Sequence, residues 1–235
     1  MCRIVGYVGE SEEDLQQLFG AFRKGSSCDP FLQRAGIPFE CHKDGWGYAM
    51  IDSTGVHHYR TARAVYQDDA GLPRLQGKIF AILHSRLGSD QTLNGHICAH
   101  PFAGATDDAV LFFAHNGGVD FKDLPARMVD SEWAFRQILK AGSVEGALPK
   151  LMEQTKDGSA LNLLILSLPR DNKKSPALHY LNYYKTKEEG RVAYYQMYSG
   201  DMPGGRAVFS STLKDLAIPG LANVETAVTG SLLSL

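Results

Sequence analysis

Cys2 is the residue whose position in this chain most directly suggests covalent chemistry. If Met1 is removed, Cys2 becomes the first residue, with its thiol and its free α-amine on neighbouring carbons. An α-amine has an ordinary pKa of about 7.7–8.0, so at neutral pH it can accept the thiol proton directly or through one water. Such a nucleophile needs no catalytic histidine. Taken alone, the Met-Cys start is better explained by a chance buried residue at the head of a strand.

A glycine-rich run further along the chain offers donors for the charge that such a nucleophile would create. Attack on a carboxamide builds negative charge on its oxygen, and this charge needs fixed donors. The run 113–118 leaves an apolar strand with the sequence Phe-Ala-His-Asn-Gly-Gly. Asn116 supplies a side-chain amide, and Gly117 lets a backbone N–H approach a ligand closely. An ordinary hairpin turn explains the Asn-Gly pair as well.

Arg86 and Asp130 are suited to the two charged groups of an amino-acid substrate. Glutamine carries an α-carboxylate that an arginine binds and an α-ammonium group that an acidic residue binds. Arg86 follows an apolar run, and Asp130 precedes a stretch with helical spacing. A surface ion pair for Arg86 and a helix N-cap for Asp130 are the alternative interpretations.

Together these residues resemble the class II glutamine amidotransferases, which are of the N-terminal-nucleophile (Ntn) hydrolase type. The matching segments, in chain order, are Cys2 with Ile4-Val5-Gly6, His84-Ser85-Arg86-Leu87-Gly88-Ser89, Ala99-His100-Pro101, His115-Asn116-Gly117 and Asp130-Ser131-Glu132. Asp44-Gly45-Trp46-Gly47 resembles a stretch of the stand-alone members, and Ala207–Ser211 resembles the strand that closes the domain.

The resemblance implies a four-layer αββα sandwich and a γ-glutamyl thioester on Cys2. It implies that Asn116 and Gly117 form the oxyanion hole and that Arg86 and Asp130 hold the amino-acid end of the substrate. The implied further pocket residues are Leu87, Ser89 and His100, with His115 supporting the oxyanion loop from behind. Many members have Trp at the position of Leu87 and His at that of Asp90, so the substrate could differ from free glutamine.

The pattern of apolar residues independently predicts an α+β layered domain over residues 1–235. Strands are expected at 2–8, 46–52, 56–60, 78–84, 109–115 and 161–168, with a tyrosine-rich strand pair at 178–184 and 192–198 and short edge strands at 207–210 and 224–228. Helices are expected at 12–24, capped by Ser11, at 131–141 and at 144–154. A long loop is expected at 25–45, and turn-rich sequence at 87–107.

Composition excludes several other classes of protein. The net charge is -2, and no basic stripe suggests nucleic-acid binding. No run is long enough for a membrane span, and four widely separated cysteines without a signal peptide favour a reduced, cytoplasmic location. His96-x-Cys98-x-His100 lacks the spacing of a standard zinc site, so no metal is expected, and no cofactor is expected either.

Three functions remain open at this stage. The chain could release ammonia from glutamine for an acceptor on a separate subunit, because 235 residues leave no room for an acceptor domain. It could instead be a stand-alone hydrolase of γ-glutamyl amides or peptides, which the differences at Leu87 and Asp90 favour. A non-catalytic regulator that binds a partner on the same fold is the third, and the presence of Cys2, Arg86, Asn116 and Asp130 together argues against it.

Overall fold

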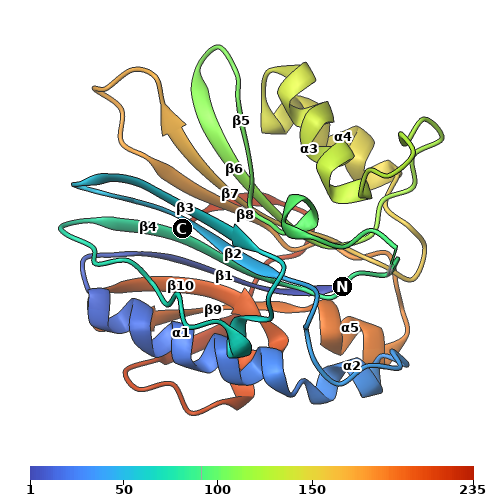
Figure 1. Ribbon diagram of the computed structural model, residues 1–235, viewed down its shortest axis with the longest axis horizontal. Helices are drawn as coiled ribbons and strands as arrows, with labels where there is room; N and C mark the ends of the chain where they lie inside the picture. The colour runs from blue at the N-terminus through green and yellow to red at the C-terminus, as the bar shows by residue number, and fades with distance from the viewer. Residues whose placement is uncertain (91) are drawn as a thin grey trace.

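The computed structural model describes residues 1–90 and 92–235 and forms four layers, with two sheets stacked face to face between outer helices (Figure 1). The seven-stranded sheet runs, in spatial order, β11 (Ala222–Thr226), β9 (Met197–Met202), β10 (Gly205–Ser210), β1 (Cys2–Gly9), β4 (Ile79–Arg86), β2 (Trp46–Asp52) and β3 (Gly55–Thr61). The five-stranded sheet runs β12 (Leu232–Ser234), β8 (Ala177–Leu181), β7 (Leu161–Pro169), β6 (Ala109–Gly117) and β5 (Phe102–Ala105). The four-layer α+β fold expected from the sequence is therefore confirmed.

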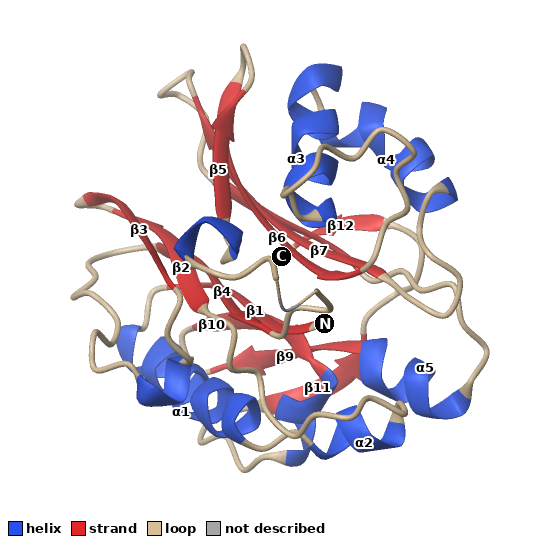
Figure 2. Cartoon of the chain, turned by 45° about the vertical axis from the view of Figure 1, so that its right-hand side comes forward, coloured by secondary structure: helices blue, strands red, loops and turns tan. Residues whose placement is uncertain are grey.

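The helices cover the two outer faces, as Figure 2 shows from a second side. On the seven-stranded sheet lie α1 (Glu12–Ser27), α2 (Pro30–Arg34) and α5 (Glu189–Tyr195), and on the five-stranded sheet lie α3 (Asp130–Ala141) and α4 (Val144–Glu153). Short 3-10 turns occupy Val65–Gln67, His96–Cys98 and Ser211–Asp215. None of the helices in the described ranges is long and apolar enough to cross a membrane.

Alternation along β1 shows how the layers are assembled. Val5 and Tyr7 point to the cluster beneath α1, while Ile4 points to the cluster between the sheets. All three are fully buried, as expected for a strand covered on both faces. The start of α1 also follows the sequence, because the side chain of Ser11 accepts a hydrogen bond from the backbone N–H of Asp14 at 3.1 Å.

Four local expectations were wrong. Residues 25–45 contain α2, which Asp29 caps and Pro30 begins. The expected second tyrosine strand at 192–198 is instead mostly α5, because burial of Tyr194 and Tyr195 beside α2 decides its conformation. The turn-rich stretch 87–107 includes β5, and β10 is an inner strand between β1 and β9, although an edge strand was expected.

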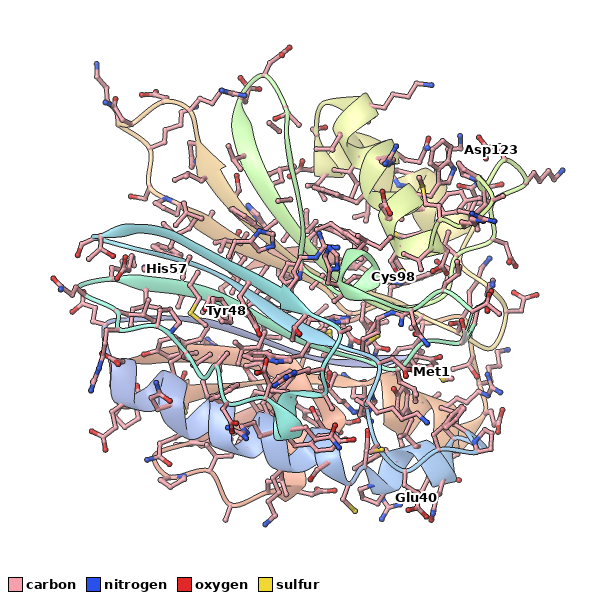
Figure 3. The ribbon with its side chains drawn as sticks, viewed as in Figure 1. Met1, Glu40, Tyr48, His57, Cys98 and Asp123 are labelled. Carbon is pink, nitrogen blue, oxygen red and sulfur yellow. The ribbon has the colours of Figure 1, made fainter. Side chains whose placement is uncertain are left out.

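Strand register brings three of the expected functional residues to one end of the sandwich. Cys2 begins β1 and lies opposite Arg86, the last residue of β4. Asn116 is next to last in β6, two residues after Ala114, which packs between the sheets. Because side chains alternate along a strand, Asn116 faces the same inter-sheet layer. Figure 3 shows this end by the label of Met1, with His57 at the opposite end of the sheets.

Candidate functional site

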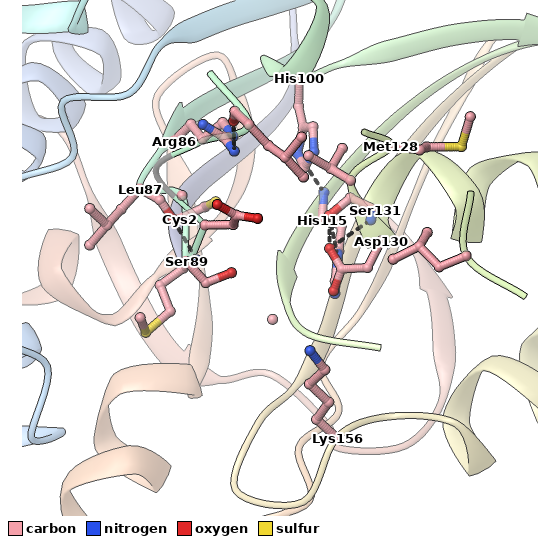
Figure 4. Close-up of a pocket in the computed structure, with 17 residues that line it drawn as sticks. Cys2, Arg86, Leu87, Ser89, His100, His115, Met128, Asp130, Ser131 and Lys156 are labelled. Carbon is pink, nitrogen blue, oxygen red and sulfur yellow. Dashed lines mark hydrogen bonds between the residues drawn. The ribbon is translucent and has the colours of Figure 1, made fainter. Parts of the chain in front are cut away.

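A pocket of about 220 Å³ opens where β1, β4 and β6 meet. Figure 4 shows Cys2 and Arg86 on one side, with His115, Ser131 and Asp130 on the other. The volume is below the roughly 300–1,000 Å³ of pockets that take drug-sized ligands, so the pocket fits a ligand of amino-acid size. Its lining residues are Met1, Cys2, Arg86, Leu87, Gly88, Ser89, Asp90, Leu93, His100, His115, Gly117, Leu124, Met128, Val129, Asp130, Ser131 and Lys156.

Met1 continues the β1 ladder at the pocket wall. Its terminal ammonium donates to the carbonyl oxygen of Leu87 at 2.7 Å, and the N–H of Leu87 donates back to the Met1 carbonyl at 2.8 Å. In this form the nitrogen of Cys2 is an ordinary amide and has no basic lone pair. Loss of Met1 would expose the α-amine of Cys2 and free both backbone groups of Leu87.

The Cys2 thiol is buried but has a lowered pKa. Burial raises the pKa of Cys2, yet the terminal ammonium and the neighbouring His84 outweigh burial and lower it to about 6. Cys2 is 5% exposed, and it lines the pocket through that small opening. Most of the thiol is therefore ionised at neutral pH, which is the nucleophilic form.

Asn116 is buried with an unused donor. Its Oδ1 accepts the backbone N–H of Cys2 at 2.7 Å, and this contact fixes the orientation of the amide because an N–H requires an acceptor. The Nδ2 atom is buried and has no hydrogen-bond partner. An unpaired buried donor costs about 1–3 kcal/mol, so it is a feature that calls for a functional explanation.

Gly117 ends β6 and lines the pocket. Its φ of 149° lies in the range that favours glycine, and a Cβ at this position would collide with the carbonyl oxygen of Ala160. Asn116 and Gly117 thus close a strand, so the alternative interpretation of this pair as a hairpin turn is wrong.

Arg86 is held in place by the loop that follows it. Its guanidinium donates to Asn94 Oδ1 at 2.9 Å and to the carbonyl of Leu93 at 2.8 Å. Although it is 5% exposed, the side chain still contributes to the pocket wall. The alternative interpretation of Arg86 as one half of a surface ion pair therefore does not fit.

Asp130 is fixed opposite Arg86 across the pocket. Its Oδ2 accepts the N–H of Val119 at 2.9 Å, and its Oδ1 accepts the N–H of Ser131 at 2.8 Å. The N-cap of α3 is Val129, so Asp130 is the first helical residue and not the cap. The alternative interpretation of Asp130 as the N-cap is therefore wrong by one residue. The N–H of Val119, which lies outside α3, also orients the carboxylate.

Three buried histidines cluster at the pocket, and two of them, His100 and His115, line it. The rings of His84 and His100 are 4.0 Å apart, and the N–H of His115 donates to His100 Nδ1 at 3.3 Å. Burial lowers the pKa of His115 to about 4 and that of His100 well below its usual value. Both rings are therefore neutral near pH 7. His115 Nδ1 lies 2.8 Å from Ser131 Oγ, so His115 connects β6 to α3.

A charged network supports β1 from the opposite face. Arg3 Nε and His42 Nε2 approach Asp29 Oδ2 at 2.6 and 2.7 Å, and Thr212 donates to Asp29 Oδ1 at 2.7 Å. The Arg3 guanidinium stacks on Tyr194, whose hydroxyl donates to the carbonyl of Cys2 at 3.3 Å. The paired Arg3 charge lowers the pKa of Asp29 despite its burial. This network fixes the backbone that carries the thiol.

Every residue selected from the sequence lies at this site. Seven of the eight line the pocket, and Asn116 contacts the backbone of Cys2 from beside it. Asp90, one of the positions where the chain departs from the resemblance, lines it too. His96 and Cys98 form a 3-10 turn, and in the described part of the chain no group of three His, Cys, Asp or Glu side chains is arranged to hold a metal.

Sequence reasoning missed Lys156, Asp29 and the role of His84 beside the thiol. Lys156 lies 40 positions beyond Asn116 in a short turn that looks like any polar turn. Asp29 belongs to the stretch taken as a loop. The alternation along 79–86 would have placed His84 on the same face as Arg86, since they are two residues apart in a strand.

Comparisons with known proteins give a consistent fold. No family model matches the chain, and no curated protein matches its sequence. Among solved structures, it is similar to a glutamine phosphoribosylpyrophosphate amidotransferase from B. subtilis, with TM-score 0.62, 15% identity and coverage of 99% of this chain and 47% of that one. It is also similar to an allosteric regulatory enzyme of purine biosynthesis, with TM-score 0.56 and 16% identity. That match covers 99% of this chain and 46% of the other.

A third structure is closer in length to this chain. A predicted glutamine amidotransferase from Pseudomonas aeruginosa PA01 matches with TM-score 0.50 and 17% identity over 99% of this chain and 92% of that one. The chain therefore spans about half the length of the two enzymes named first and most of the third. At these identities the likeness establishes the fold alone, which is the four-layer α+β fold that this chain shares with the three structures.

Proposed function

We propose that the chain, once Met1 is removed, is an amidohydrolase that uses Cys2 to cleave the side-chain amide of glutamine or of a related γ-glutamyl compound. The observation that carries this proposal is the free Nδ2 of Asn116, a buried donor next to the backbone of the nucleophile. A donor left unpaired in the resting protein fits a group that is satisfied only when an oxyanion forms.

The geometry suggests a role for each residue during the reaction. The α-amine of Cys2 takes the thiol proton, and the thiolate attacks the δ-carbonyl of the substrate. Asn116 Nδ2 and the N–H of Gly117 stabilise the oxyanion. The C–N bond then breaks, the amine leaves with the proton, and a γ-glutamyl thioester remains on Cys2. Water hydrolyses this thioester and releases glutamate.

Arg86 and Asp130 explain selectivity for an amino-acid substrate. A guanidinium on one wall binds the α-carboxylate, and the carboxylate of Asp130 on the opposite wall binds the α-ammonium group. Ser89 and His100 border the same space. The small pocket leaves no room for a large second substrate, so ammonia released from glutamine would reach water or an acceptor on a separate subunit.

Labelling and turnover together test this proposal. The mature protein is treated with a glutamine-analogue diazo-ketone and the adduct is mapped by mass spectrometry, while glutamate release from glutamine is measured in parallel. We expect modification of Cys2 alone, and no glutamate release by the Cys2→Ala variant at unchanged thermal stability. Cys98→Ala is the matched control, because it removes another buried thiol that does not line the pocket and should retain activity. Labelling of Cys98 in place of Cys2 would refute the proposal.

A further inference from the structure

The pocket contains one cation more than free glutamine can use. Arg86 and Lys156 both line it. If Arg86 binds the α-carboxylate, glutamine offers no second anionic group, because its other end is a neutral carboxamide. Free glutamine therefore has no second anionic group for Lys156 to bind.

Lys156 is directed toward the pocket by its surroundings. Its backbone N–H donates to the carbonyl of Gly118 at 2.9 Å, and its carbonyl accepts the N–H of Ser159 at 3.1 Å. The side chain runs closely over Gly118, where an added Cβ would lie 3.1 Å from Lys156 Cδ. Figure 4 shows its ammonium group reaching into the pocket from the side opposite Arg86.

The present partner of Lys156 is weak and exchangeable. The ammonium lies 3.4 Å from Asp120 Oδ1, with the two side chains 48% and 73% exposed. Such exposed pairs contribute at most about 1 kcal/mol. Two further carboxylates line the pocket and already have partners. Asp90 accepts the N–H and the hydroxyl of Thr92, and Asp130 accepts the N–H groups of Val119 and Ser131. A substrate carboxylate could thus replace Asp120 at little cost.

Apolar side chains from the loop before α3 complete this part of the pocket. Leu124, Met128 and Val129 line it, and Leu124 is 37% exposed at the surface. An apolar wall with a single ammonium group suits an amino acid bound through its carboxylate. Free ammonia, the leaving group of glutamine, would use neither feature.

We infer that Lys156 binds a carboxylate on the leaving amine, so that the preferred substrates are γ-glutamyl amino acids or short γ-glutamyl peptides. This inference rests on the proposed function and narrows its substrate class. In the reaction the γ-glutamyl amide C–N bond breaks, the amino acid leaves with a proton on its nitrogen, and water later supplies the hydroxyl of the released glutamate.

Two matched substrates test the inference. γ-Glutamylglycine and γ-glutamylglycinamide differ only in a carboxylate against a carboxamide on the leaving group. We expect mature wild-type protein to cleave the acid with a kcat/KM on the order of 2- to 5-fold higher, the range that one partly exposed ion pair can supply. Added salt should reduce this ratio because it screens the pair.

Variants locate the source of the preference. Lys156→Met should bring the ratio near one, Lys156→Glu should invert it, and Lys156→Arg should keep it. Lys122→Met is the control, since Lys122 is exposed on the loop before α3 but does not line the pocket. It should leave the ratio unchanged.

Failure of the inference and failure of the proposed function give different results. Cleavage of glutamine or the glycinamide with no preference for the acid, or a preference that survives in Lys156→Met, would overturn the inference alone. If none of the three substrates were cleaved by a chain with a free Cys2 amine, the proposed function would fail and the inference with it.

Discussion

The backbone N–H of Cys2 donates to Asn116 Oδ1 at 2.7 Å. This contact joins the first residue of β1, in the seven-stranded sheet, to the end of β6, in the five-stranded sheet. It sets two properties at once. Cys2 is held at a fixed distance from β6, and the amide of Asn116 is turned so that its Nδ2 donor stays free. Removal of Met1 would convert the N–H into an amine that can still donate to the same oxygen.

Exchange of the Asn116 amide for a carboxylate separates these two properties. Asn116→Asp keeps an acceptor for the Cys2 nitrogen but removes the free donor. We expect kcat for glutamate release to fall by about 10²–10³, the usual effect of losing one oxyanion donor, with a smaller change in KM. Steady-state kinetics would measure this. If Asn116→Asp kept more than a tenth of the wild-type kcat, Nδ2 would not be an oxyanion donor.

We expect the carboxylate of Asp130 to bind the α-ammonium group of the substrate. Asp130→Asn keeps the size of the side chain but removes its charge, and charge-assisted hydrogen bonds contribute about 1.5–3 kcal/mol. The kcat/KM for glutamine should therefore fall by roughly 10- to 100-fold. For a glutamine analogue that lacks the α-amine, the same substitution should lower kcat/KM much less. Asp123→Asn is the control, because Asp123 is exposed and does not line the pocket. An equal fall in kcat/KM for both substrates in Asp130→Asn would show that Asp130 does not bind the substrate amine.

The sequence was sufficient for those parts of the fold and site that local pattern determines. Alternation and capping predicted β1, the β2–β3 hairpin, β7 and the helices α1, α3 and α4. Selected residues such as Cys2, Arg86 and Asp130 lie together because each is next to the end of a strand or the start of a helix, and antiparallel pairing brings such ends together.

The parts of the fold and the site that the sequence did not predict depend on contacts between segments distant in the chain. The stretch with Tyr194 and Tyr195 has strand-like residue types, yet burial against α2 and Arg3 makes it helical. Asp29 looks like an ordinary N-cap until Arg3 and His42 are placed beside it. Lys156 reaches the pocket only because its turn pairs with Gly118, which no local pattern reveals.

The thiol of Cys2 should titrate far below an ordinary thiol in the form that retains Met1. Burial opposes ionisation, but the terminal ammonium and His84 lower its pKa to about 6. The rate of iodoacetamide alkylation at Cys2, mapped by mass spectrometry, should therefore be half-maximal near pH 6. His84→Gln should move this midpoint to higher pH. Cys98, whose pKa is raised by burial, is the internal control. A midpoint unaffected by His84→Gln would exclude His84 as a cause.

Blocking the N-terminus should abolish turnover without loss of the fold. In the Met1 form the Cys2 nitrogen is an amide, and the pocket wall is occupied by the Met1–Leu87 backbone pair. An uncleavable extension ahead of Met1 should reduce glutamate release to background, whereas the same extension after Leu235 should leave activity intact. Intact mass establishes which form is present. Full activity of a chain proven to retain Met1 would show that the α-amine is not the base.

Buried histidines should make the fold sensitive to mild acid. His42, His100 and His115 are buried, and burial lowers the pKa of each, to about 4 for His42 and His115. Between pH 6.5 and 4 the unfolded chain binds protons at these positions and the native chain does not, so stability falls as pH falls. The slope is up to about 1.4 kcal/mol per pH unit for each histidine.

Urea denaturation at pH 7.5, 6.0 and 5.0 measures this slope without interference from the buried carboxylate. The pKa of Asp29 is lowered by Arg3 and His42, so its stabilisation is complete above the ordinary carboxyl range of about 3.9 and is lost only below it. The lowered pKa of the Cys2 thiol also makes stability fall toward pH 6, so the slope is measured in the Cys2→Ala variant, where acid sensitivity above pH 5 reports the histidines. His42→Gln, which cannot ionise, should reduce the slope although it lowers stability at pH 7.5. A free energy of unfolding that stayed constant from pH 7.5 to 5.0 would mean that these histidines ionise alike in the native and unfolded chains.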